Sequence, residues 1–194
     1  MLMLLRGMIV LMLCCGFARA EVAPTKGDAV TGLAQTLPAA TLKKLRAAPD
    51  TFLANAASLI YGYGAGGGID AAGIDGFIAA ERARIRARDM TQYLAADLNN
   101  DGDISRDEVA ALAAATQASK RGRLQRGFDL ADANANGIMS IAELRGFAEG
   151  TATAQMSAED ADALKALLQF DADGNGVVAM DEVAAGVSAL MEGS

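Results

Sequence analysis

Three short stretches of the chain place oxygen-bearing side chains at alternate positions. The first contains Asp97, Asn99 and Asp101, then Gly102, and ends at its twelfth position with Glu108. Oxygen donors in this order suit a hard divalent cation. Calcium takes about six to eight oxygen ligands at roughly 2.3–2.6 Å, so the chain must curl around it. Glycine at position 6 makes the sharp turn without steric cost. The stretch therefore predicts a cation-binding loop.

The same pattern recurs in the loops that start at Asp132 and Asp171, which lie 35 and then 39 residues further along the chain. Both have glycine at position 6 and glutamate at position 12. Aspartate, asparagine and glycine also form ordinary turns, but the repetition decides against turns alone. The period is the length of a helix, a loop, a second helix and a connector, so the sequence predicts repeated helix–loop–helix units.

Metal ligands are expected at fixed positions of each loop: side-chain oxygens at positions 1, 3, 5 and 12, and a backbone carbonyl at position 7. Position 9 acts through water, although Ala179 there offers no side-chain oxygen. No catalytic residue and no residue binding an organic cofactor is predicted. The candidate metal ligands are Asp97, Asn99, Asp101, Asp103 and Glu108; Asp132, Asn134, Asn136, Ile138 and Glu143; and Asp171, Asp173, Asn175, Val177 and Glu182.

These loops resemble those of the EF-hand superfamily, in the manner of calmodulin-like and exported calcium-binding proteins, over about residues 50 to 192. The resemblance implies Ca²⁺ as the cofactor and an all-α fold of two pairs of EF-hands, with short two-residue β ladders between paired loops. It also implies that successive hands pair through position 8. The expected partners are Ile69 with Ile104, and Met139 with Val178.

A further segment, residues 62–73, lies 35 residues before the first loop and is rich in glycine. It keeps glycine at position 6 and Ile69 at position 8, but glycine replaces the ligands. We interpret it as a degenerate first hand that has the shape and not the metal; the alternative is a flexible glycine linker. Hands 2, 3 and 4 are then those with loops 97–108, 132–143 and 171–182.

The first twenty residues combine a basic residue, an apolar run of about a dozen residues and a small-x-small end, which predicts a secretory signal cleaved after Ala20. The run is short for a bilayer span, so no stable membrane anchor is expected after cleavage. Lipid attachment at Cys14 is an alternative. We therefore expect an exported protein, periplasmic or secreted.

The mature chain would contain no cysteine, and the whole chain has no histidine. The commonest general base, zinc ligands and thiol nucleophile are thus missing, and an enzyme is not expected. The one enzymatic alternative is an acid–base pair of Glu81 and Asp89. Losing Arg6 and Arg19 with the signal leaves 15 basic against 24 acidic residues, a net charge of −9 that disfavours nucleic acid.

The expected organisation is a mobile leader over 21–40, a first EF-hand pair over 41–116 and a second over 117–194. One long helix, about 71–96, would serve both hand 1 and hand 2. Glycines in the basic stretch 120–128 suggest a bend, and 150–156 is expected to be a polar connector. Apolar residues four positions before each loop are expected in the core: Tyr93, Phe128 and Leu167.

Two roles for the bound calcium remain open from the sequence. Calcium could expose an apolar groove for a protein or peptide partner, or be buffered; alternatively it could stabilise a structural domain without signalling. The alternating arginines of 82–88 are interpreted as a solvated surface with acidic neighbours, the alternative being a site for an anionic partner. The methionines that suit either a groove or a core are Met90, Met139, Met156, Met180 and Met191.

Overall fold

The computed structural model describes residues 32–192, and this part of the chain is mostly helical. None of its helices has the length and apolar character that a membrane crossing requires. The helices are α2 (Ala39–Ala47), α3 (Pro49–Tyr63), α4 (Ala71–Leu94), α5 (Arg106–Ala114), α6 (Ala118–Ala131), α7 (Ile141–Gln155), α8 (Ala158–Lys165), the 3₁₀ helix η1 (Ala166–Phe170) and α9 (Met180–Glu192). The strands are β1 (Gly68–Ile69), β2 (Ile104–Ser105), β3 (Ile138–Met139) and β4 (Val178–Ala179).

The strands form two antiparallel ladders, but their partners differ from the expected ones. Strand β1 pairs with β4, with Ile69 opposite Val178, and β2 pairs with β3, with Ile104 opposite Met139. The expected pairing of Ile69 with Ile104 and of Met139 with Val178 is therefore wrong. The cause is α4, whose 24 residues hold the loops of hands 1 and 2 about 36 Å apart.

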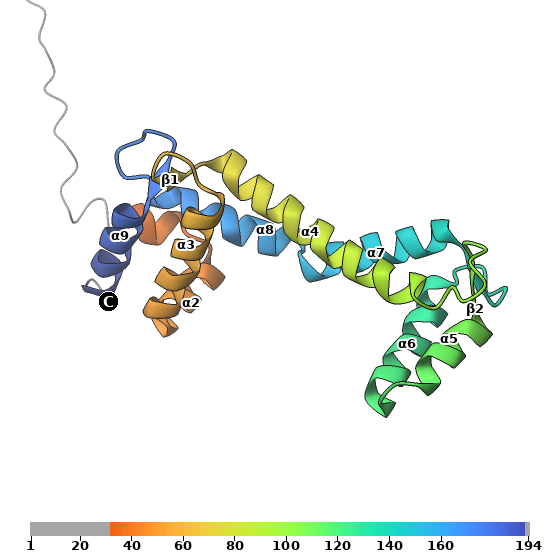
Figure 1. The fold of residues 1–194 in the computed structure, drawn as a ribbon. Helices are drawn as coiled ribbons and strands as arrows, with labels where there is room; N and C mark the ends of the chain where they lie inside the picture. Colours follow the sequence, from red (N-terminus) through yellow and green to blue (C-terminus); the bar gives the residue numbers. More distant parts are fainter. Residues whose placement is uncertain (1–31, 193–194) are drawn as a thin grey trace, which may run out of the picture.

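The pairing divides the molecule into two lobes at opposite ends (Figure 1). The outer lobe contains hands 1 and 4 together with α2, and its core includes Leu45, Ile60 and Phe170. The inner lobe contains hands 2 and 3 around Tyr93 and Phe128. The expected boundary between 116 and 117 consequently falls inside the inner lobe, between α5 and α6.

Helices α4 and α7 run side by side between the lobes and form a stalk (Figure 1). Ile85, Ala148 and Ala152 are buried along it, and small alanines let the two helices approach closely. Arg82 donates two hydrogen bonds, of 3.2 and 2.9 Å, to the carbonyl oxygen of Met156 at the end of α7. The expected polar connector at 150–156 is wrong, because α7 continues to Gln155.

The other arginines of α4 have acidic partners, as the solvated-surface interpretation requires. Arg84 pairs with Glu81 at 2.6 Å, and Arg88 pairs with Asp89 at 3.1 Å. Arg86 reaches across the stalk to Glu149, with 3.1 Å between nitrogen and oxygen. These arginines therefore also hold α4 against α7, which their spacing in the sequence does not reveal.

The glycines of 120–128 do not bend the chain, since α6 is continuous through both. Gly127 instead makes room for Tyr93, whose hydroxyl would collide with any Cβ at this position. The Tyr93 hydroxyl donates a 3.1 Å hydrogen bond to the carbonyl of Leu124. Burial raises the pKa of Tyr93 to about 12, which keeps this donor protonated.

Position-based expectations about the core are confirmed. Tyr93, Phe128 and Leu167 are all buried, and the four residues at position 8 of the hands are fully buried in the ladders. Leu37, within the expected leader 21–40, is only 5% exposed and belongs to the core of the outer lobe. The expected signal at 1–20 and the first part of the leader lie outside the described residues.

Candidate metal centre

The three ligand-rich loops share one hydrogen-bonded frame, which begins with the aspartate at position 1. Asp97 accepts hydrogen bonds from the backbone amides of positions 5 and 6, at 3.2 and 3.1 Å. Asp132 does the same at 3.1 and 2.9 Å, and Asp171 at 3.2 and 2.9 Å. Each loop thereby wraps around its first carboxylate, and the backbone is curled as a central cation requires.

The tight curl depends on left-handed backbone at positions 4 and 6. Gly102, Gly137 and Gly176 at position 6 have φ of 88°, 83° and 83°, a region that glycine occupies without penalty. At position 4, Asn100 and Ala135 have φ of 57° and 55°. A non-glycine residue pays a cost there, which the surrounding loop must offset.

Position 12 closes each loop from the first turn of the following helix. One carboxylate oxygen of Glu108 accepts from the amide of Leu98 at 3.0 Å, and Glu182 accepts from Ala172 at 2.8 Å. Glu143 reaches the side-chain amide of Asn134 at 2.9 Å. The glutamate therefore joins the two ends of the loop, with the start of the next helix as its support.

The serine at position 9 has a role that we did not predict. Ser105 accepts from the amide of Glu108 while Glu108 accepts from the amide and hydroxyl of Ser105, a complete capping box at the start of α5. Ser140 and Glu143 form the same box at α7. The sequence signal, serine followed three residues later by glutamate, was present in both loops. The box expected at Ser157 and Asp160 is also formed.

The capping hydrogen bonds affect ionisation. Bonds from the backbone and then the hydroxyl of Ser105 hold the pKa of Glu108 below its usual value, and Ser140 does the same to Glu143. Both glutamates are thus kept ionised, as a cation ligand must be.

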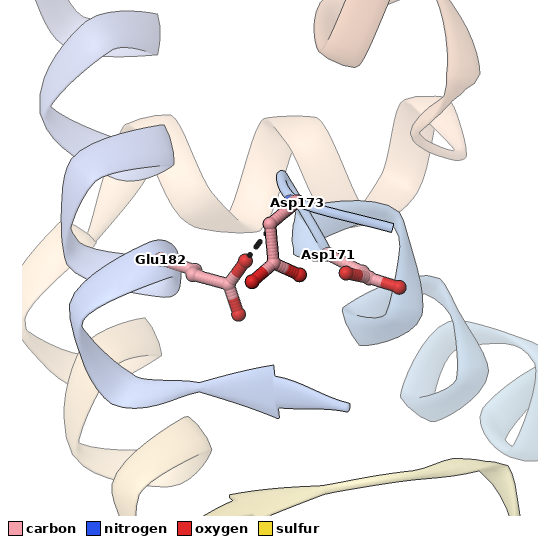
Figure 2. A group of neighbouring side chains, drawn as sticks. All are labelled: Asp171, Asp173 and Glu182. Carbon is pink, nitrogen blue, oxygen red and sulfur yellow. Dashed lines mark hydrogen bonds between the residues drawn. The ribbon is translucent and has the colours of Figure 1, made fainter. Parts of the chain in front are cut away.

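Hand 4 brings its acidic groups together most closely (Figure 2). Carboxylate oxygens of Asp171, Asp173 and Glu182 all lie within 4.8 Å of one another. In Figure 2, Glu182 projects from α9 toward Asp173, whose amide donates to it at 3.4 Å. Within residues 32–192 no other three acidic side chains approach this closely, so Asp97, Asp101 and Glu108 are less converged. The oxygen-only donor set fits calcium.

Hand 1 has the ladder but not the loop. Helix α3 extends to Tyr63, and a tight turn follows in which Ala65 and Gly68 exchange hydrogen bonds of 2.9 and 3.4 Å. A Cβ on Gly64 would collide with the carbonyls of Ile60 and Gly68, so no ligand side chain fits there. Asp70 caps α4 by accepting from Gly73 at 2.8 Å. Hand 1 is therefore a folded packing partner and not a flexible linker.

Comparison with known proteins agrees with this geometry. Residues 94–113, which cover the loop of hand 2 with its flanking turns, match the family model described as EF hand. The chain is thus an EF-hand superfamily protein, and an EF hand implies calcium binding. Neither the search of curated proteins nor the search of solved structures gave a match.

Proposed function

We propose that the protein binds three calcium ions, one each in loops 97–108, 132–143 and 171–182. The observation that carries the proposal is the common frame: in each loop the position-1 aspartate gathers the turn amides and the position-12 glutamate closes the ends. Loop 62–73 has neither group. In the three loops, the side chains at positions 1, 3, 5 and 12 would hold the ion together with the position-7 carbonyl.

Calorimetric titration of residues 21–194 tests the stoichiometry after treatment with a chelator. We expect three equivalents of calcium for the parent chain and two for each of Glu108→Gln, Glu143→Gln and Glu182→Gln. Asp70→Asn, in hand 1, is the matched control and should retain three. A parent chain that takes up no calcium, or loses none of its sites in these variants, contradicts the proposal.

We further propose that residues 1–20 direct export and are removed. The support is the sequence pattern, together with a mature chain that has no cysteine to oxidise. The mass of the protein recovered from the producing cell decides this. A chain starting at Glu21 is expected, whereas a lipid-modified chain starting at Cys14 would contradict cleavage at Ala20.

In the cell, we propose that the protein is a calcium-responsive interaction or buffering module and not an enzyme. Glu81 and Asp89 are about 12 Å apart along α4 and are engaged by Arg84 and Arg88, which argues against an acid–base pair. Two grooves with mostly apolar lining, one on each lobe, support the interaction role.

A calcium-stabilised structural domain is the second candidate, favoured by the acidic cluster of hand 4. Three carboxylates within 4.8 Å repel one another until a cation is bound, so calcium would stabilise the folded outer lobe. Binding of an apolar dye, measured with circular dichroism, separates the candidates. Increased dye binding at constant helicity supports the interaction role, and a gain of helicity with loss of dye supports the structural one.

A further inference from the structure

The inner lobe has a surface groove that the calcium loops do not use. Helices α4, α5 and α6 enclose a space of about 520 Å³. Its apolar lining includes Ala87 and Ala95 of α4, Leu112 of α5 and Leu124 of α6. Along α4 the groove extends from residue 84 to residue 95, about 16 Å or three helical turns. This is the length of a short helix laid beside α4.

The charged residues that line the groove are Arg84, Arg88 and Lys120, all cations. Arg84 and Arg88 share their charge with Glu81 and Asp89, so they contribute little net charge. Lys120 is different, because it forms no ion pair with any residue of 32–192. The net positive charge of the groove therefore comes from the side of α6.

Helix α6 extends this positive charge beyond Lys120. It carries Lys120, Arg121, Arg123 and Arg126 and a single acid, Asp129, which is already paired with Arg106 at 2.7 Å. The whole chain has a net charge of −7, so this helix is charged opposite to its molecule. Arg121 and Arg123 are exposed. An anionic partner is attracted here and repelled elsewhere.

We infer that this groove binds an acidic amphipathic helix of a partner protein, which lays its apolar face on Ala87, Leu112 and Leu124 and directs its carboxylates toward Lys120 and Arg123. The apolar lining requires an apolar partner face, and the surplus cations select the acidic sign. A polyphosphate such as nucleic acid lacks the apolar face and would be opposed by the net charge of the chain. This inference rests on the proposed interaction role.

The test uses the 21–194 chain with calcium and two fluorescein-labelled helical peptides of about 14 residues. One has leucine on one face and glutamate on the other, and the second has lysine in place of each glutamate. Fluorescence anisotropy should show at least about tenfold tighter binding of the acidic peptide, with the preference falling as salt is raised.

Two variants locate the site. Lys120→Glu with Arg123→Glu should weaken the acidic peptide about tenfold or more, and Ala87→Trp should block the groove for it by filling the space. The matched control reverses two exposed charges elsewhere, Arg46→Glu with Arg145→Glu, and should bind as the parent does. Calcium titration of every variant should still give three equivalents.

Several outcomes would overturn the inference. These are equal binding of the two peptides, equal weakening by the control pair, or no acidic-peptide binding by a chain that takes up calcium normally. Binding to anionic phosphatidylglycerol vesicles without binding to the acidic peptide would assign the groove to a membrane and also overturn it. Failure of the calcium titration itself would instead contradict the proposed function.

Discussion

The glutamate at position 12 has two structural tasks in this protein. In hands 2 and 3 it closes the loop with one carboxylate oxygen and, with the other, accepts from the serine that caps the next helix. In hand 4 the position-9 residue is Ala179, and Glu182 accepts only from its amide, at 2.9 Å. The three loops therefore differ in how firmly their closing glutamate is held and in how much negative charge they offer.

The charge difference predicts that loop 132–143 is the weakest site. Among positions 1, 3, 5 and 12 it has two carboxylates, Asp132 and Glu143, whereas the other two loops have three each. Glu143→Gln should thus abolish the lowest-affinity step of a calcium titration, read with a competing chelator. Loss of the highest-affinity step in that variant would show the ranking to be wrong.

Removal of the capping hydroxyl should destabilise the calcium-free protein. Ser140→Ala leaves the first turn of α7 without its cap, so urea denaturation at pH 7 should show a loss of about 1 kcal/mol. Ser58→Ala is the control, because its hydroxyl only bonds within α3, to Ala54. A loss as large in Ser58→Ala as in Ser140→Ala would indicate that capping is not the cause.

The same capping contact predicts a pH dependence. The pKa of Glu143 is lowered in the folded state, so its contribution to the free energy of unfolding is complete above its unfolded pKa and disappears as the pH falls through the lowered value. Metal-free Ser140→Ala should therefore lose less stability than the parent below about pH 4.3, the ordinary glutamate pKa. Parallel curves for the two proteins would contradict this.

At the scale of elements, the ladders decide which sites communicate. The β2–β3 ladder joins loops 97–108 and 132–143 directly, and Arg106 adds further contacts. Its amide donates to the carbonyl of Gly137 at 3.1 Å, and its guanidinium lies 4.9 Å from the ring centroid of Phe128. The loop of hand 4 is joined only to the ligand-free hand 1.

We therefore expect calcium binding to be cooperative between hands 2 and 3 and independent at hand 4. Glu108→Gln should weaken calcium binding at loop 132–143 and leave loop 171–182 unchanged. The backbone amide resonances of Gly137 and Gly176 report the two loops separately during titration. A shift in the midpoint of Gly176 equal to that of Gly137 would rule out this partition.

The loops were predictable from sequence because metal ligation fixes residue types at fixed intervals, and the core positions followed from the helical period before each loop. The ladder partners were not predictable in this way. Each ladder needs only an apolar residue at position 8, and Ile69, Ile104, Met139 and Val178 are interchangeable in that respect. The length of α4 decides between the pairings, since a helix unbroken from Ala71 to Leu94 separates the loops at its ends.

At the scale of the molecule, two lobes joined by a helical pair behave as separate cores. The inner lobe is continuous in sequence from the second half of α4 to α7, whereas the outer lobe combines the beginning and the end of the described chain (Figure 1). Between the lobes the stalk buries mainly Ile85 and two alanines. Its side contacts, such as Arg82 to Met156, therefore matter for keeping α4 and α7 together.

Fragment studies should follow this division. Residues 79–156 contain α5, α6, α7, most of α4 and the whole inner core, so this fragment should fold and unfold cooperatively with calcium present. Residues 41–116 split both ladders and both cores and should remain largely unfolded. Circular dichroism with thermal melting distinguishes them. A cooperative melt of 41–116 alone would contradict the assignment of the two lobes.

The wrapped arrangement of the outer lobe has a consequence for the order of events during biosynthesis. Ile104 and Met139 are 35 residues apart, so the inner ladder closes a short loop, but Ile69 must wait for Val178, 109 residues later. The longer closure costs only about 1 kcal/mol more in chain entropy. The partner strand, however, is among the last segments to leave the ribosome. Until then Ile60 and Ile69 lack most of their apolar cover, which makes the nascent N-terminal half a natural client for chaperones.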